Sequence, residues 1–311
     1  ELENTVSFGC DVVKKEELPS VVNRLVSTME LNKVIKVPQR KNGMTSSGKA
    51  NCCHPNVQLL VDTIGGERLV GYEVDVCKNV VFKHGKSSSF YSHGVSIGNM
   101  YQVQNKNYIQ FMAWQVKGGG HWRGDIGRLK LGDDFDSLEL DPKEVYFGSD
   151  GEDKVSLSYS WVMFDEGIYK MWYGSTIDWS SENGEMVHVI KYTTSQDGEV
   201  WEKHGLAIPF KIGDAQAFSR PTAFKDDDGY HMWFSYRSGD GTKYRIGYAY
   251  SPDGLNWDRK KDSGIDVSPD GWDSEMICYP FVFYHKGKKY MLYNGNDYGK
   301  TGFGLAVLED D

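Results

Sequence analysis

The chain has 311 residues, of which 39% are hydrophobic and 14% aromatic, and its net charge at pH 7 is -9. Because acidic residues outnumber basic ones and no run of Lys or Arg occurs, the surface would repel a polyanion, so we expect no nucleic-acid partner. No apolar run reaches the roughly 18 residues of a membrane-spanning helix, so no membrane span is expected.

The first residues, Glu1-Leu2-Glu3-Asn4, do not read as a signal peptide. We therefore expect a cytoplasmic protein, while secretion stays open because a leader can be trimmed from a chain. Residues 1–45 show little periodicity and are interpreted as an N-terminal extension. Within it, Glu16–Met29 could form a short helix, since its apolar side chains fall on one helical face.

From residue 94 onward the sequence repeats a strand-like pattern. Three apolar segments contain Met171, Met232 and Met291, which follow one another at intervals of 61 and 59 residues. A period of this length, made of strand-like pieces, is typical of a β-propeller, in which each repeat forms one small sheet, or blade. We predict an all-β protein in which residues 46–311 form a five-bladed β-propeller, with Pro55–Cys77 supplying one blade.

The four later blades have recognisable second and third strands. Alternating aromatic and apolar residues predict second strands at 108–114, 169–173, 230–236 and 290–293. Third strands are predicted at 126–129, 189–192, 245–248 and 303–306. Two blades continue with Ser-x-Asp-Gly-x-x-Trp, which predicts a tight hairpin at the Asp-Gly pair and a structural packing role for Trp201 and Trp257.

Metal and cofactor chemistry finds little support in the sequence. Five cysteines occur at scattered positions without a CxxC pair, namely Cys10, Cys52, Cys53, Cys77 and Cys278. Buried thiols in a reducing compartment are the simplest interpretation. No histidine–carboxylate pair with metal-ligand spacing is apparent, and no GxSxG, Walker or GxGxxG motif occurs, so we expect neither metal nor cofactor.

The segment that leads into the last blade contains two carboxylates beside aromatic residues. It reads Trp272-Asp273-Ser274-Glu275-Met276-Ile277-Cys278-Tyr279-Pro280. Because an apolar setting raises the pKa of a carboxyl group, such a residue can donate a proton near neutrality. We predict Glu275 as a general acid, with Asp273 as its modulator or as a hydrogen-bond acceptor for substrate. The alternative is that one of the two caps a turn or pairs with an arginine.

Arginines and histidines supply the other polar candidates. Arg220, in Ser219-Arg220-Pro221, and Arg237 are predicted to anchor an anionic or polyhydroxylated group, although at least one arginine among Arg237 and Arg245 is expected in a structural ion pair. His54 and His93 lead into the first two blades, where each could orient a sugar or relay a proton, or serve only as a hydrogen-bonded structural group.

Aromatic residues are the last group of candidates, because an aromatic face can cover the apolar face of a sugar ring. Most of the aromatic residues are expected to fill the sheets. The candidate sugar platforms are Trp114, Tyr159, Trp161, Trp179 and Tyr279, with Asn294 as a further substrate-binding residue.

Several of these stretches resemble one family. Ser219–Pro221, Tyr244–Trp257, Gly271–Pro280 and Tyr290–Asn296 are similar to segments of the five-bladed propeller superfamily of glycoside hydrolases. That superfamily includes the arabinanase and xylosidase group of family 43, the invertase and levansucrase groups of families 32 and 68, and the mannoside phosphorylases of family 130. The likeness is greatest to uncharacterised bacterial members associated with surface polysaccharide clusters, and it covers residues 94–309.

The resemblance implies an enzyme that hydrolyses or transfers a glycosyl unit of an oligosaccharide or glycoside in a central pocket. Hydrolases of this superfamily place acidic residues in the first three blades, whereas here the corresponding segments are 51–55, 91–94 and 157–161, none of which contains Asp or Glu. Hydrolysis needs two carboxylates, while phosphorolysis needs an acid and cations that hold phosphate. An inverting phosphorylase that uses phosphate therefore stays an alternative, as does a non-catalytic glycan-binding propeller.

Overall fold

The computed structural model describes residues 57–64, 67–74, 82–116, 118, 120–132, 137–142, 144–239, 243–285 and 288–308. The described elements are β-strands, apart from the short helix α2 (Asn296–Gly299). The chain divides into two compact units, Val81–Ser263 and Glu1–Val80 with Gly264–Asp311. The expected extension with its helix, His54 and four of the five cysteines lie outside the described residues, and the remaining one, Cys278, is buried.

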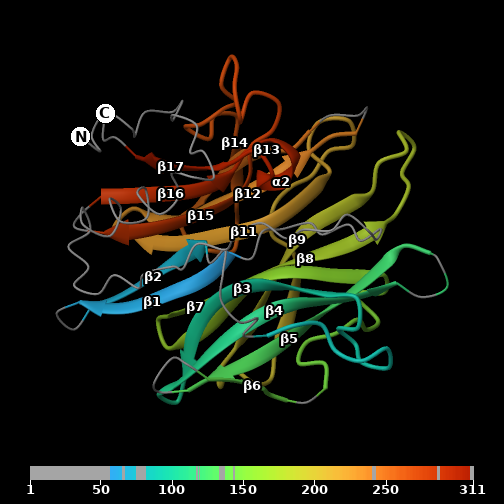
Figure 1. Ribbon diagram of the computed structural model, residues 1–311, viewed down its shortest axis with the longest axis vertical. Helices are drawn as coiled ribbons and strands as arrows, with labels where there is room; N and C mark the ends of the chain where they lie inside the picture. The colour runs from blue at the N-terminus through green and yellow to red at the C-terminus, as the bar shows by residue number, and fades with distance from the viewer. Residues whose placement is uncertain are drawn as a thin grey trace, which may run out of the picture. The chain divides into compact units, whose positions relative to one another are not determined.

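The unit Val81–Ser263 contains three successive antiparallel groups of four strands (Figure 1). The second and third groups are joined into one eight-stranded sheet by a parallel pairing of His188 with Ala217. The first comprises β3 (Gly94–Val103), β4 (Lys106–Val116), β5 (Trp122–Leu131) and β6 (Leu138–Leu140). The second comprises β7 (Ser156–Asp165), β8 (Ile168–Asp178), β9 (Val187–Ser195) and β10 (Glu202–Leu206). The third comprises β11 (Ala217–Asp226), β12 (Gly229–Arg237), β13 (Arg245–Ser251) and β14 (Asp258–Lys260).

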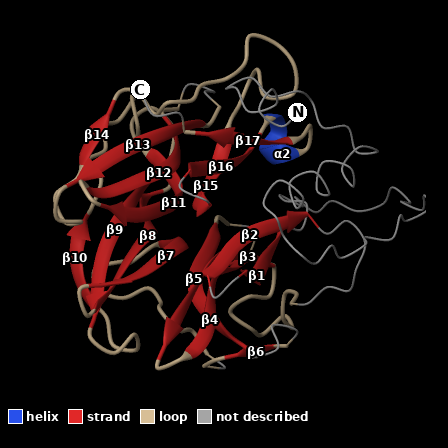
Figure 2. Ribbon diagram, turned by 90° about the vertical axis from the view of Figure 1, so that its left-hand side faces the viewer, coloured by secondary structure: helices blue, strands red, loops and turns tan. Residues whose placement is uncertain are grey.

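The second unit contains two smaller sheets. The hairpin β1 (Val57–Ile64) and β2 (Glu67–Val74) lies within the stretch predicted as one blade. The antiparallel sheet of β15 (Cys278–His285), β16 (Lys288–Asn294) and β17 (Phe303–Val307) forms the last repeat (Figure 2). The predicted second strands coincide with β4, β8, β12 and β16, and the predicted third strands coincide with β5, β9, β13 and β17. The all-β prediction is therefore confirmed.

The Ser-x-Asp-Gly-x-x-Trp motifs form the predicted turns. In the third group, Gly254 has φ of +75° and donates its backbone N–H to Ser251 Oγ at 2.8 Å, while Ser251 Oγ donates to Asp253 at 2.9 Å. Trp257 then turns back to donate its indole N–H to the Gly254 carbonyl at 3.0 Å and is 6% exposed. The packing role predicted for this tryptophan is confirmed.

Apolar side chains pack between neighbouring groups within the unit Val81–Ser263. One cluster joins the second and third groups around Trp172, Met232 and Phe234, and another joins the first and second around Ile126 and Met171. The backbones also approach closely, because a Cβ at Gly124 in β5 would lie 2.0 Å from the Leu157 carbonyl oxygen in β7. Because apolar side chains are buried on both faces of the second group, the three groups are packed firmly against one another.

A β-bulge interrupts the first strand of the four repeats that begin with β3, β7, β11 and β15. The register shifts between Ile97 and Met100 in β3 and between Ser158 and Ser160 in β7. It shifts again between Ser219 and Thr222 in β11, and between Cys278 and Phe281 in β15. Since a bulge redirects a side chain, the residues at these positions, including Tyr159, Arg220 and Tyr279, share one structural role along the repeat.

Candidate functional site

The loop that carries Asp273 and Glu275 is held firmly at the edge of the last sheet. The Asn296 side chain accepts the backbone N–H groups of Glu275 and Met276 at 2.8 and 2.9 Å and donates to the Gly271 carbonyl at 3.2 Å. Thr301 Oγ1 donates to the Trp272 carbonyl at 2.7 Å. The backbone beneath both carboxylates is therefore fixed by side chains of the segment that follows β16.

The two carboxylates have opposite environments. Glu275 is exposed, whereas Asp273 is only 1% exposed. Tyr293 donates its hydroxyl to Asp273 Oδ2 at 3.1 Å, and Asp273 Oδ1 is buried without a hydrogen-bond partner among the described residues. The expected pair thus consists of one carboxylate at the surface and one in the interior.

Two tyrosines with unusual backbone geometry lie in the same unit. Tyr279 and Tyr298 have φ of +59° and +61°, and their rings stack at 6.1 Å. A non-glycine residue in this region costs of the order of 1 kcal/mol, and such strain is concentrated at functional sites. Asn294, predicted to bind substrate, donates its side-chain amide to the Tyr298 carbonyl at 3.1 Å and so supports this segment.

Arg220 occupies the bulge of β11 with φ of +48°. Its guanidinium lies 4.3 Å from the centre of the Tyr159 ring, which stands at the bulge of β7. Two residues chosen separately from the sequence as candidate substrate contacts are therefore neighbours. A guanidinium stacked on a ring keeps the donors around its edge directed within the plane, where they can meet an anion or paired hydroxyls.

Arg237 lies in an ion pair. Its Nε is 2.9 Å from Glu185 Oε2 and its Nη2 donates to Glu185 Oε1 at 3.1 Å. The guanidinium also lies 5.0 Å from the centre of the Tyr244 ring, and Arg245 Nη1 donates to the Tyr244 carbonyl at 3.1 Å. The expectation that one of these arginines forms a structural ion pair is confirmed for Arg237, whose charge is matched by Glu185.

His188 is a buried histidine that is not among the candidates selected from the sequence. It lies in β9, with Nε2 2.5 Å from Ser158 Oγ and Nδ1 2.7 Å from Thr176 Oγ1. Burial, with a further contribution from the charge of Arg237, lowers the pKa of His188 to about 3. The ring is therefore neutral at physiological pH and bridges two hydroxyl groups between neighbouring strands.

His93 and Trp114 lie at the same end of the first group. His93 is exposed, with Nδ1 3.0 Å from Ser92 Oγ, and its ring lies 6.4 Å from that of Trp114. The backbone N–H of His93 donates to the Trp114 carbonyl at 3.1 Å. Of the two histidine candidates, the described residues therefore place His93 beside a candidate platform, whereas His54 lies outside them.

The other two tryptophan candidates have rings in contact with neighbours. Trp161 packs against the buried cluster between the second and third groups. Trp179 stacks face to face with His121 at 4.7 Å and meets the edge of Trp122 at 4.8 Å. Of these three residues, only Trp179 was a candidate from the sequence. The structure shows that it forms an aromatic cluster with His121 and Trp122.

One histidine–carboxylate group escaped the sequence analysis. Asp226, Asp228 and His231 bring ligand-type atoms within 4.8 Å of one another at the β11–β12 hairpin. His231 Nε2 lies 2.8 Å from Asp226 and 3.0 Å from Asp228, and Nδ1 lies 2.7 Å from the Tyr248 hydroxyl. These hydrogen bonds account for the cluster, and the spacing Asp-x-Asp-x-x-His was the signal that could have revealed it.

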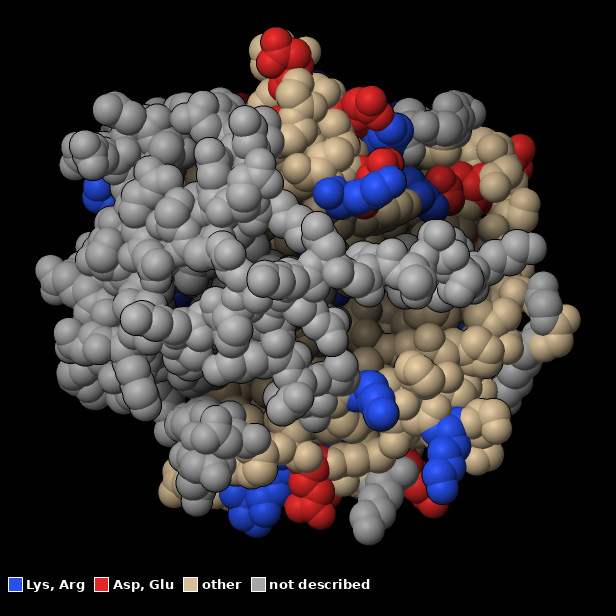
Figure 3. Space-filling view, viewed as in Figure 1, with Lys and Arg blue, Asp and Glu red and all other residues tan. Residues whose placement is uncertain are grey.

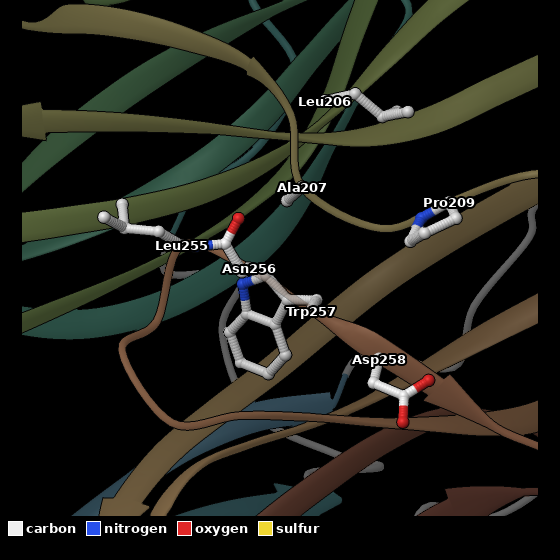
Figure 4. A pocket seen from close by; sticks show the side chains of 7 residues that line it. All are labelled: Leu206, Ala207, Pro209, Leu255, Asn256, Trp257 and Asp258. Atoms are coloured by element: carbon white, nitrogen blue, oxygen red, sulfur yellow. The ribbon is translucent and has the colours of Figure 1, made fainter.

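The groove in Figure 4 is lined by both polar and apolar residues. It has a volume of about 370 Å³ and is lined by Leu206, Ala207, Pro209, Leu255, Asn256, Trp257 and Asp258. None of the candidate residues lines it. On the face in Figure 3, the described basic and acidic side chains occur near one another rather than in one basic patch.

Comparison with known proteins places the chain in a family. No family model matches the sequence. Two proteins of Mycobacterium tuberculosis, uncharacterized protein Rv1502 and uncharacterized protein MT1551, are each 40% identical over 256 residues, which cover 81% of this chain and 82% of theirs. The chain belongs to the family of these two proteins. The alignment with these members of the Rv1502 family spans most of the chain.

Solved structures show the fold of the Rv1502 family. A glycoside hydrolase superposes with a TM-score of 0.63 at 13% identity and covers 96% of both chains. A complex of BT0996 with RGII gives 0.59 at 14% identity, covering 78% of this chain and 75% of the other. A structure from the GH130 family of mannoside phosphorylases, which contains glycoside hydrolases that target beta-1,2 mannosidic linkages in Candida mannan, gives 0.51 at 18% identity, covering 79% and 73%.

These likenesses confirm the predicted propeller fold, and the number of five blades stays a prediction. Among the described residues, no helix has the length and hydropathy needed to cross a membrane.

Proposed function

We propose that the protein is a carbohydrate-active enzyme of the glycosidase type, which hydrolyses or transfers a glycosyl unit of an oligosaccharide or glycoside. The observation that carries the proposal is the clamped loop with Glu275 at its surface, in a chain with a glycoside hydrolase fold. Asn296 fixes the backbone of Glu275, so the carboxyl group is offered from a rigid support, as a general acid requires.

The acid step would be a proton transfer from Glu275 to the oxygen of the scissile glycosidic bond. As this oxygen accepts the proton, its bond to the anomeric carbon breaks and the developing positive charge is spread over the sugar ring. Water, or the hydroxyl of an acceptor, forms the new bond to that carbon and releases a proton. The stacked Tyr279 and Tyr298 rings, in the same unit as Glu275, could cover a sugar ring, and their strained backbones favour a functional role.

The Arg220–Tyr159 pair would bind an anionic or polyhydroxylated part of the substrate. Stacking on Tyr159 orients the guanidinium, and an oriented fork binds paired oxygens better than a mobile one. In this proposal Arg237 has a supporting role, because its ion pair with Glu185 already matches its charge. His93 beside Trp114 is a secondary candidate for orienting a sugar.

Phosphorolysis is the second candidate, and a specific observation favours it. The strand β7 provides no carboxylate at the bulge where Tyr159 stands, and the structural relatives include the family of mannoside phosphorylases. A phosphorylase needs no second carboxylate, since phosphate attacks the anomeric carbon while the acid protonates the leaving oxygen. Arg220 would then bind phosphate.

The experiment measures turnover of a panel of aryl glycosides and oligosaccharides, each with and without inorganic phosphate. The variants are Glu275→Gln and, as a matched control on the same loop, Asp270→Asn, which removes an exposed carboxylate. The proposal expects turnover to fall in Glu275→Gln and not in Asp270→Asn, with binding of substrate retained in both.

Three results separate the candidates. Strict dependence on phosphate with release of a sugar 1-phosphate assigns phosphorolysis, and activity without phosphate assigns hydrolysis or transfer. Glycan binding without turnover of any panel member would overturn the enzyme proposal in favour of a glycan-binding propeller.

A further inference from the structure

Two repeats carry the same buried pair of an aspartate and a tyrosine. Asp153 precedes the bulge residue Tyr159 by six positions, as Asp273 precedes Tyr279. Each aspartate accepts a hydrogen bond from the tyrosine 20 residues later, at 2.9 Å from Tyr173 and at 3.1 Å from Tyr293. Both aspartates are 1% exposed, so the two sites can be compared group by group.

In the second group the buried charge is fully compensated. Besides Tyr173, Asp153 accepts hydrogen bonds from Ser175 at 2.6 Å, Lys191 at 2.8 Å and Lys203 at 2.5 Å. Burial alone would raise the pKa of the Asp153 carboxyl, yet the hydrogen bonds from the two lysines and the serine lower it to about 2. Two ammonium groups and two hydroxyls therefore surround this carboxylate.

The strands described for the last repeat lack the corresponding donors. Lys191 pairs with Tyr173 across the strands, and the residue that pairs with Tyr293 is Gly304. By the same count, the position of Ser175 is occupied by Gly295. The strands described for this repeat end at β17, so none supplies an equivalent of Lys203. Asp273 Oδ1 accordingly has no hydrogen-bond partner in the part of the chain that the structure describes.

Packing explains why the protein itself does not fill these positions. A Cβ at Gly295 would lie 2.4 Å from the Trp272 ring, and a Cβ at Gly304 would lie 2.5 Å from the Tyr293 ring. The neighbouring rings therefore leave room only for glycine at both positions. The second group therefore surrounds Asp153 with two cations. The last repeat gives Asp273, within the described residues, one neutral donor, the Tyr293 hydroxyl.

We propose that Asp273 binds an ammonium group, which donates to Oδ1 and supplies the positive charge that Lys191 and Lys203 provide to Asp153. A carboxylate is an acceptor only, and a buried one without a cation is costly, so a protonated amine satisfies both its hydrogen-bonding and its charge requirement. If the protein acts on glycosides as proposed above, the ammonium group belongs to a substrate that carries an unsubstituted amino sugar. A free ammonium ion has the same charge and the same hydrogen-bond donors.

The test measures binding without turnover, by calorimetry and by the thermal unfolding midpoint. The probes are D-glucosamine and ammonium chloride, compared with D-glucose, N-acetyl-D-glucosamine and sodium chloride at equal ionic strength. We expect D-glucosamine or ammonium to bind and raise the unfolding midpoint of the wild type, while the three comparison solutes do not. In Asp273→Asn the dissociation constant should rise by about 100-fold, the usual result of removing one partner of a buried ion pair.

Tyr293→Phe is the matched control. Phenylalanine already occupies the equivalent place in the third group, where Phe234 faces the bulge of β11, so the fold accepts this change. It removes the neutral donor to Oδ2 and leaves the charge of Asp273, so ammonium binding should persist. Selective response to D-glucosamine assigns an amino sugar, and response to ammonium chloride alone assigns a small cation.

Equal responses to D-glucosamine, D-glucose and sodium chloride, or unchanged amine binding in Asp273→Asn, would overturn the proposal. Failure of the proposed enzymatic function is distinguished from this outcome, because Glu275→Gln should abolish turnover while leaving amine binding intact.

Discussion

Arg220 and Tyr159 stand at bulges in the first strands of neighbouring groups, and the guanidinium of one lies 4.3 Å from the centre of the other's ring. Their separation in sequence is about one repeat, so the contact follows from packing equivalent strands side by side. A cation–π contact of this type contributes about 0.5–2 kcal/mol, depending on how far it is withdrawn from water.

Replacing Tyr159 tests whether the ring orients Arg220 for substrate. Tyr159→Phe retains an aromatic face, so the Michaelis constant for the proposed substrate should stay within about twofold of the wild type. Tyr159→Leu removes that face and should raise the Michaelis constant by about tenfold, corresponding to the loss of ~1.4 kcal/mol of binding. Steady-state kinetics check this, and equal effects of the two changes would contradict it.

The lowered pKa of Asp153 leads us to expect a loss of stability in acid. Its pKa is lowered to about 2 in the folded protein, against about 3.9 for an unfolded chain, so its contribution is present above pH 4 and is lost as the pH falls towards 2. The contribution is about 3 kcal/mol, because the pKa differs by about two units between the folded and unfolded states at 1.36 kcal/mol each.

Urea unfolding between pH 4 and pH 2 measures this contribution. Lys203→Gln removes one of the two ammonium partners, so the acid-induced loss should start at the same pH, end at a higher pH and be smaller in total. An unchanged pH profile in Lys203→Gln would show that the lysine does not hold the charge of Asp153.

The lowered pKa of His188 leads us to expect a second acid-dependent loss of folding stability, in a different pH range. Burial lowers its pKa to about 3, whereas an unfolded histidine has a pKa near 6.5, so the folded state binds fewer protons between these values. Stability is therefore full above pH 6.5 and falls as the pH decreases towards 3. Between pH 7 and pH 4 the loss should be about 3 kcal/mol.

The comparison variants for this prediction are His188→Gln and His121→Gln. Glutamine can still meet Ser158 or Thr176 but does not titrate, so His188→Gln should lose the pH dependence of this window. The exposed His121 should behave as the wild type. A wild-type profile that is flat from pH 7 to pH 4 would contradict the assignment.

Trp257 tests the packing between the second and third groups. It is 6% exposed in the cluster that contains Trp172 and Met232. Trp257→Ala should lower the free energy of unfolding by about 3–5 kcal/mol, as expected for a large-to-small change in a core. The exposed Val200→Ala should change it by less than about 0.5 kcal/mol, and denaturant unfolding distinguishes the two.

The sequence was sufficient to predict the strand order and the turns. The methionine-centred segments form the strands β8, β12 and β16, and the Ser-x-Asp-Gly-x-x-Trp turns depend on hydrogen bonds within a few residues. Local periodicity and local hydrogen bonding carry this information, so no long-range contact is needed to recognise it.

The site was predicted less completely because its properties depend on contacts between distant residues. The environments of Asp273 and Glu275 depend on contacts made by Asn296, Thr301 and Tyr293, which span 20 to 29 residues of sequence. The pairing of Arg237 with Glu185 and the bridge of His188 to Ser158 likewise span 52 and 30 residues. Residue types alone suggested the candidates, and only the fold shows which charges are matched.

The central claim, that Glu275 donates a proton to a leaving oxygen, is tested most directly by leaving-group dependence. Wild type and Glu275→Gln are compared on two glycosides of the same sugar, one with a nitrophenolate leaving group and one with a simple alcohol. The account predicts that Glu275→Gln loses about 100- to 10,000-fold in rate on the alcohol glycoside and much less on the nitrophenyl glycoside, which leaves without protonation. Equal losses on both, or no loss on either, would contradict the assignment of Glu275 as the acid.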